Sequence, residues 1–343
     1  MMRVEIPASL FDDDECYESL LQLILFFRDV RHEWVISPLD VDTVSNFFDR
    51  NLSAPLAQTY SAIVKKASRA GYTWAPVEDR RPVLRVARGT LEEDVEDLRR
   101  PAVLVVENRK YDWMFISAVA KLLGMEDILR AEDANLLDVR NGGGADGAVS
   151  EAVDQVRRFT RTKRVVLVID SDRYRPGERT KNHTRAESVA DAGGYAHVLE
   201  FRELENYVPN RVLARQARRR GHAHMSTRLQ ALKKLTHVQR AHFDMKNGFK
   251  EQQAGTAGWA ERKSTSTGDP SAAYHIPRQH GDLYHGVNEG TLITLRKGFG
   301  TSLPKLFLDE VGIGGISEKD LDGLGLNATE ELRKVLDTIL DII

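Results

Sequence analysis

Two carboxylates follow a run of five apolar residues near the middle of the chain. Residues 165–169 read VVLVI, and Asp170 and Asp172 come directly afterwards with one serine between them. Carboxylates held this close raise each other's pKa and destabilise a fold unless a cation neutralises them. Carboxylate oxygens are ligands that suit Mg²⁺ or Mn²⁺. The spacing therefore predicts a divalent-metal site at the end of a strand.

Further acids follow other predicted strands. Glu107 ends the apolar run at 101–106, and Glu203 and Glu205 come after a predicted strand at 195–201. Because the carboxyl ends of parallel strands meet at one edge of a sheet, we expect these acids to lie near Asp170. Such a cluster can hold one ion, or a pair that clamps both reacting oxygens of a phosphodiester. The alternative is structural, since Asp-Ser-Asp is also common in loops and helix N-caps.

The elements that must position these acids alternate along the chain. We predict strands at 101–108, 135–139, 164–170 and 195–201, and helices at 112–125, 148–160 and 184–192. A glycine-rich segment, NGGGADG, lies at 141–147. Strands that alternate with helices favour right-handed crossovers and a parallel sheet. The expected fold class is α/β, a mostly parallel sheet flanked by helices, with a helical N-terminal region and an α-rich C-terminal region.

Three regions are expected on this basis. Residues 1–98 should form a mainly helical region, because 14–30 and 54–70 have the apolar spacing of amphipathic helices. Residues 99–210 should form the catalytic domain, and 211–343 a basic region of helices and loops. An apolar stripe over 332–343 should pack on this chain or on a partner, which makes a homo-oligomer one expectation.

Composition narrows the class of protein. The 343 residues carry a formal net charge of −2 and 41% hydrophobic residues, as in an ordinary globular protein. Cys16 is the single cysteine, which excludes an intramolecular disulfide and fits a reducing compartment. The longest early apolar run, at 20–27, is far shorter than the roughly 20 residues of a spanning helix. We therefore expect a cytoplasmic protein with no membrane partner.

Positive charge is concentrated in one stretch. Residues 206–243 contain nine Lys or Arg and no Asp or Glu. Lys and Arg contact nucleic-acid phosphates independently of sequence, although many charge runs are only solvated helix faces. We take the following as candidate nucleic-acid contacts: Arg215, Arg218, Arg219, Arg220, Lys233 and Lys234. His275, His280 and His285 recur every five residues, which is not a helical ligand spacing, and no zinc site is predicted there.

Three segments resemble a known family. VLVVENRKYD (103–112) resembles the first Toprim motif, and RVVLVIDSDR (164–173) resembles the second. EFRELENYVP (200–209) is similar to a segment downstream of Toprim in the OLD-like nucleases, a group that includes stand-alone Toprim effectors of bacterial anti-phage systems. The resemblance covers residues 100–210, about a third of the chain. It implies a Toprim-like fold and one or two Mg²⁺ or Mn²⁺ ions.

The resemblance also implies roles for individual residues. Glu107 takes the place of a glutamate that acts as metal ligand or general acid/base, and Asp170 and Asp172 take the places of metal-binding, catalytic aspartates. Glu203 and Glu205 match acids that help to hold a second metal ion. Asp112 matches a further acid of the metal site. The chain departs from the family where Asn108 replaces a glycine and where the usual Gly-Lys is missing, so Lys297 is only a candidate assisting lysine.

The function expected from these features is divalent-metal-dependent cleavage of DNA or RNA, in anti-phage defence. The chain has no G-x-x-x-x-G-K-[ST] motif, so an ATPase sensor would have to be a separate partner. The rival dehalogenase-type motif D-x-D-x-[TV] fails at Tyr174. The alternative that stays open is a catalytically silent Toprim-fold binding or assembly subunit that works with a partner ATPase.

Overall fold

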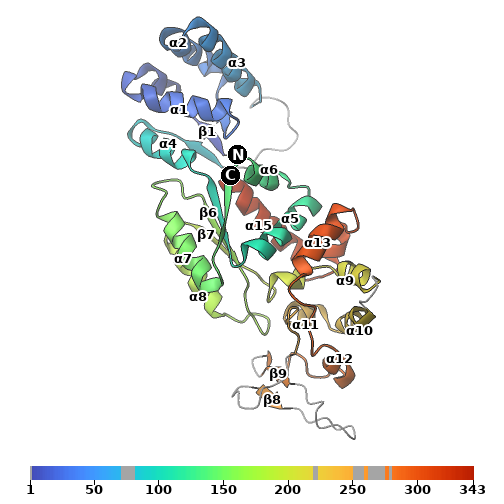
Figure 1. Ribbon diagram of the computed structural model, residues 1–343. Helices are drawn as coiled ribbons and strands as arrows, with labels where there is room; N and C mark the ends of the chain where they lie inside the picture. The colour runs from blue at the N-terminus through green and yellow to red at the C-terminus, as the bar shows by residue number, and fades with distance from the viewer. Residues whose placement is uncertain (1, 71–81, 219–222, 250–258, 262–274, 278–279) are drawn as a thin grey trace.

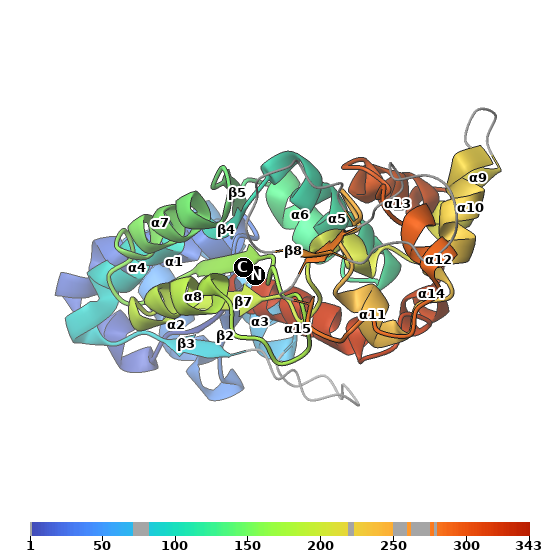
Figure 2. The same ribbon diagram turned by 90° about the horizontal axis from the view of Figure 1, so that it is seen from below.

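The computed structural model describes residues 2–70, 82–218, 223–249, 259–261, 275–277 and 280–343. The N-terminal region lies at one end of the molecule, the main sheet lies in the middle, and the C-terminal helices lie beside the sheet (Figure 1). When the molecule is turned by 90°, the C-terminal helices again lie to one side of the main sheet, and the N-terminal region overlaps with α7 and α8 in this view (Figure 2). No helix in the described ranges combines the length and the apolar character needed to cross a membrane.

Four parallel strands form the main sheet, in the order β5-β4-β6-β7. Their bounds are β4 (Ala102–Val106), β5 (Leu137–Asn141), β6 (Val165–Ile169) and β7 (Tyr195–Val198). Every residue of the central strands β4 and β6 is buried, which is why both are continuous apolar runs in the sequence. This sheet and its flanking helices confirm the predicted α/β class and are consistent with a Toprim-like fold.

Helices cover both faces of this sheet. One face, with Val103, Val105 and Leu167, packs against α7 (Ala145–Val156) and α8 (Lys181–Asp191). The other face, with Leu104 and Val166, belongs to the largest hydrophobic cluster. That cluster includes α5 (Arg109–Leu122), α6 (Asp127–Asp133) and most of the C-terminal helices, so one core extends across residue 210.

The C-terminal region is mostly helical, as predicted. Its helices are η5 (Leu204–Tyr207), α9 (Asn210–Ala217), α10 (Ala223–Leu232), α11 (His237–Ala241), α12 (Glu289–Thr294), α13 (Leu303–Gly312), α14 (Glu318–Asp322) and α15 (Ala328–Ile342). β8 (Trp259–Glu261) and β9 (His275–Pro277) form an antiparallel pair. The apolar stripe of α15 packs against β6, α5 and α6 of its own chain. That stripe is therefore not available as a subunit interface.

The N-terminal region has its own hydrophobic cluster. Its helices are α1 (Tyr17–Arg28), α2 (Val41–Asn51), α3 (Ala54–Ala70) and α4 (Leu91–Arg99), with short turns η1 (Ala8–Asp12), η2 (Asp14–Cys16), η3 (Pro38–Asp40) and η4 (Arg88–Thr90). It also contains a small parallel sheet that the sequence did not predict, β2-β1-β3. The strands β1 (Arg3–Glu5), β2 (Glu33–Val35) and β3 (Val83–Arg85) have three residues each, too few to produce a periodic pattern.

A buried carboxylate fixes this region to the main sheet. Asp97 of α4 is fully buried, and its two oxygens accept the backbone N–H groups of Thr160, Arg161 and Thr162 at 2.7–2.8 Å. These residues lead into β6, the strand that precedes Asp170. Three hydrogen bonds to one charged group are among the stronger polar contacts in a fold. The N-terminal region is thus attached at the start of a strand that carries a candidate site residue.

Candidate metal centre

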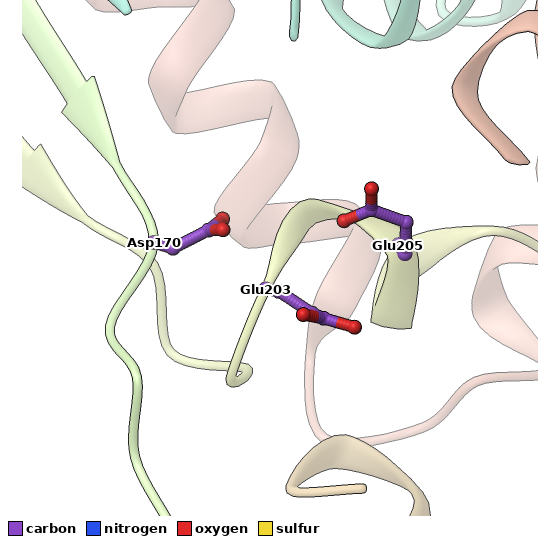
Figure 3. Close-up of side chains that lie close together, drawn as sticks. All are labelled: Asp170, Glu203 and Glu205. Carbon is purple, nitrogen blue, oxygen red and sulfur yellow. The ribbon is translucent and has the colours of Figure 1, made fainter. Parts of the chain in front are cut away.

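Three carboxylates from two segments meet at the carboxyl edge of the main sheet. Asp170 follows β6, and Glu203 and Glu205 lie at the turn η5 that comes after β7 (Figure 3). One ligand oxygen from each residue lies within 4.8 Å of the other two. Oδ1 of Asp170 accepts the backbone N–H of Leu204 at 2.9 Å, which holds the two segments together. The structure confirms that these predicted acids share one site.

The cluster has the features that a metal ion requires. Glu205 is only 3% exposed, and within the described part of the chain the close partner of its Oε2 is Nζ of Lys246, at 3.1 Å. The three carboxylates share this one ammonium group, and like charges held this close favour additional positive charge. Two oxygens on opposite sides of Mg²⁺ are about 4.2 Å apart, close to the spread of this cluster. The cluster could therefore hold a metal ion, with oxygen ligands of the hard type.

The same burial changes the acidity of all three groups. Burial raises the pKa of Asp170 and of Glu203 above the ordinary range, and it raises the pKa of Glu205 to about 7. Lys246 opposes this effect at each carboxylate because its positive charge favours the ionised form. A divalent ion would also lower the pKa values of these carboxylates, and it would do so more strongly than Lys246.

Glu107 lies next to this cluster. It follows β4, and its Oε1 accepts the backbone N–H of Asp170 at 3.0 Å. Burial, and then the charge of Asp170, raise the pKa of Glu107 to about 8. Its carbonyl accepts the N–H groups of Gly143 and Gly144, so the predicted glycine segment packs against this residue. Glu107 is thus beside the cluster, in a position to exchange a proton near neutral pH.

Glu107, Asp112 and Asp170 line one cleft, whose volume is 940 Å³. Asp112 lies in the first turn of α5, and its Oδ2 accepts the backbone N–H of Asn108 at 2.7 Å. Burial, followed by the charge of Asp170, raises the pKa of Asp112 to about 7. Neither Glu107 nor Asp112 belongs to the three-carboxylate cluster. Both predicted residues are therefore in the cleft but outside the group that could share an ion.

Asp172 is not where the sequence predicted it. Its side chain is exposed, and Oδ2 accepts a hydrogen bond from Nδ2 of Asn182 at 3.1 Å. The backbone of Asp172 is left-handed, with φ of 55°. In an extended chain, residues i and i+2 point to the same side, but a left-handed residue ends that alternation. Asp172 therefore lies outside the three-carboxylate cluster, although its charge still raises the pKa of Asp170 and of Glu107.

A lysine that the sequence analysis missed lies in the cluster. Nζ of Lys246 is 3.1 Å from Oε2 of Glu205, 3.3 Å from Oδ2 of Asp170 and 3.7 Å from Oε2 of Glu203. Its backbone N–H also donates to Oε1 of Glu203 at 2.9 Å. The predicted assisting lysine, Lys297, has an exposed side chain instead. The sequence offered only a weak signal that Lys246 belongs to the site: it is the first cation after the acid-free stretch, and it lies between the apolar residues Met245 and Phe249.

The acid-free stretch 206–243 does not form an acid-free surface. Arg215 forms an ion pair with Glu310 of α13 at 2.9 Å, and Arg211 forms one with Asp320 of α14 at 3.5 Å. Arg240 is buried and donates to two backbone carbonyl oxygens. The exposed predicted contacts are Arg218, Lys233 and Lys234, whereas Arg219 and Arg220 lie outside the described residues. Acids far away in sequence thus neutralise part of this stretch.

Other cations lie closer to the candidate centre. Arg109 and Lys110, at the start of α5, line the same cleft as Glu107 and Asp170. Both side chains are exposed, and Nζ of Lys110 lies 5.3 Å from the centre of the Tyr111 ring. Trp113 and Met114 add apolar surface to the cleft. A chain of phosphates could therefore meet positive charge next to the acids.

Of the three spaced histidines, the two whose side chains the structure describes do not belong to the three-carboxylate cluster. His280 is buried, with its ring edge-to-face against Tyr174, and burial lowers its pKa to about 4. It is a neutral packing residue. His285 is exposed, and the side chain of His275 lies outside the described part of the chain.

Comparisons of this chain with protein-family models, with curated proteins and with solved structures found no match.

Proposed function

We propose that this protein is a divalent-metal-dependent nuclease that hydrolyses phosphodiester bonds of DNA or RNA. The observation that carries the proposal is the cluster of Asp170, Glu203 and Glu205, whose three carboxylates share the single ammonium group of Lys246. This cluster borders a cleft that also contains Glu107, Asp112 and exposed cations. Sites of phosphoryl transfer combine acids that bind a cation with neighbouring positive charges that bind phosphates.

Asp170, Glu203 and Glu205 would hold Mg²⁺ or Mn²⁺, by chemistry that favours carboxylate oxygens. Such an ion, when bound, lowers the pKa of a coordinated water and stabilises negative charge on the phosphate. Glu107 can exchange a proton near neutral pH because its pKa is about 8. Its position beside Asp170 makes it the general acid or base of the proposed site.

The substrate strand would lie in the cleft of 940 Å³. Arg109 and Lys110 would contact phosphates on one side, and Lys246 would contact the phosphate nearest to the acids. Such contacts are independent of base sequence and weaken as salt rises. Arg218 directly follows α9, and Lys233 and Lys234 directly follow α10; all three are exposed and are secondary candidates for the same nucleic acid.

The biological setting rests on the resemblance to Toprim-domain nucleases of the OLD-like group. On that basis the protein would be an effector of bacterial anti-phage defence, in the cytoplasm, with a separate ATPase as sensor. The motifs that carry the resemblance include Glu107 and Asp170, which lie together in the structure.

A second candidate function is a catalytically silent binding or assembly subunit. Two observations favour it: Lys246 already neutralises part of the cluster, and Asp172 lies outside the cluster with an exposed side chain. A silent subunit would neither cleave nucleic acid nor be stabilised by divalent ions.

The test is to incubate the purified protein with plasmid, single-stranded DNA and total tRNA, with Mn²⁺ or with EDTA. We expect cleavage of at least one substrate with Mn²⁺ and none with EDTA. Asp170→Asn should reduce the rate by about 100-fold or more, because it removes a charge from the cluster. Asp191→Asn, at an exposed position on α8, is the matched control and should cleave like wild type. Absence of cleavage for every substrate with Mn²⁺ would leave the silent subunit as the better description.

A further inference from the structure

The side chain of Lys246 occupies the place where a metal ion would have to bind. One oxygen each of Asp170, Glu203 and Glu205 forms a triangle with edges no longer than 4.8 Å. Nζ of Lys246 lies 3.1–3.7 Å from an oxygen of each of these residues. An ion held by the three carboxylates would lie among the same oxygens, only about 2.1 Å from each. The ammonium group and the ion would thus share one small volume.

The two cations cannot be present together. A protonated ammonium group has no lone pair, so it cannot become a ligand of the ion. It would also repel a divalent ion at close range, in a buried site where water screens charges poorly. Occupancy by one cation therefore excludes the other.

The backbone of Lys246 is fixed, so only its side chain can move. Its N–H donates to Glu203, and its carbonyl accepts the N–H of Gly300 at 3.0 Å. A Cβ atom at Gly298 would lie 2.5 Å from the Lys246 carbonyl group, which shows how tightly the two segments pack. The side chain is 29% exposed and borders the cleft that holds Glu107 and Asp112. The cleft gives the ammonium group a place to go.

We propose that Lys246 is a built-in competitor of the metal ion, which must displace the lysine from the acidic cluster into the cleft in order to bind. The inference rests on the proposed metal centre and adds its regulation. Without metal, the ammonium group neutralises the carboxylates and holds the folded centre together. With metal, the same ammonium group is released into the cleft, where a substrate phosphate would meet it. The ion would therefore bind to the carboxylates and release the Lys246 ammonium group in the same step.

The first measurement is the affinity for Mn²⁺, by isothermal titration calorimetry, of wild type, Lys246→Met and Lys297→Met. Removal of a competitor should tighten Mn²⁺ binding by about tenfold or more in Lys246→Met. Lys297→Met is the matched control, because this exposed lysine lies in the neighbouring segment, and it should bind Mn²⁺ like wild type. Equal or weaker binding by Lys246→Met would overturn the proposal and leave the metal centre intact. Absence of Mn²⁺ binding in all three proteins would overturn both.

The second measurement uses wild-type protein and so does not depend on whether Lys246→Met folds. Surface lysines are acetylated with and without Mn²⁺, and the labelled peptides are quantified by mass spectrometry. Lys246 should react several-fold more when Mn²⁺ is present, since it leaves its three carboxylate partners, while Lys297 should react equally in both samples. Unchanged labelling of Lys246, in protein that Mn²⁺ stabilises against heat, would refute displacement.

Discussion

Replacement of Glu107 by glutamine tests whether this residue holds a proton in the metal-free protein. The half-buried carboxyl accepts the N–H of Asp170 at 3.0 Å, and its pKa is raised to about 8. Glutamine has the same size and retains an oxygen that can accept this hydrogen bond. The variant therefore removes the titration and little else.

The sign of the effect follows from the raised pKa. The unfolded chain releases the Glu107 proton near pH 4.5, whereas the folded chain keeps it until about pH 8. The stability contributed by the protonated carboxyl is fully present below pH 4.5 and is lost as the pH rises through about 8. In this window the free energy of unfolding of wild type should fall by about 1.4 kcal/mol per pH unit relative to Glu107→Gln. The total difference should reach between about 3 and 6 kcal/mol.

The assay is urea denaturation in EDTA at each pH unit from 5 to 9, with wild type, Glu107→Gln and the control Glu126→Gln. Glu126 is exposed before α6, so its variant should follow wild type at every pH. Saturating Mn²⁺ should shrink the difference between wild type and Glu107→Gln, because a nearby ion favours the ionised carboxylate. A difference that stays constant from pH 5 to pH 9 would refute the reasoning, since no proton would then be linked to folding.

Two further predictions concern the walls of the site. Gly142→Ala should lower the free energy of unfolding by at least about 2 kcal/mol, because the new Cβ would lie 2.3 Å from backbone atoms of Ala148. In the same denaturation assay Gly89→Ala, where a Cβ meets nothing within 4 Å, should change little, and equal losses would contradict the packing argument. Lys110→Ser should weaken binding of a fluorescent oligonucleotide, measured by anisotropy in EDTA, and reduce the slope of log affinity against log salt by about 1. Lys234→Ser should have the smaller effect, and the reverse order would place the nucleic acid on α10 and not in the cleft.

The main sheet could be predicted because its signals are local. The runs that became β4 and β6 are buried on both faces, so each is a continuous apolar segment. The strands β1, β2 and β3 are held by pairing with one another across long stretches of chain, as when Val4 pairs with Trp34 and Leu84, and three residues carry no pattern of their own. That small sheet could be found only in three dimensions.

The candidate site also contains some residues that local sequence could place and others that it could not. Glu107 and Asp170 follow strands that the sequence predicted, so topology alone was enough to bring them together. The direction of Asp172 depends on one left-handed residue, and nothing in its two neighbours predicts that conformation. Lys246 reaches the cluster because its backbone is hydrogen-bonded to Glu203 and packed against Gly298. Such long-range contacts leave no trace in local sequence.

The carboxylates and the lysine of this centre are held by partners far along the chain: 63 residues separate Glu107 from Asp170, and 76 separate Asp170 from Lys246. During synthesis, a chain that has left the ribosome only as far as Glu205 carries the acids but not the segment that orders them. The complete centre can therefore form only after the polypeptide has been translated well past that point. A translation product that stops before Lys246 would carry the three acids without the ammonium group that lies among them.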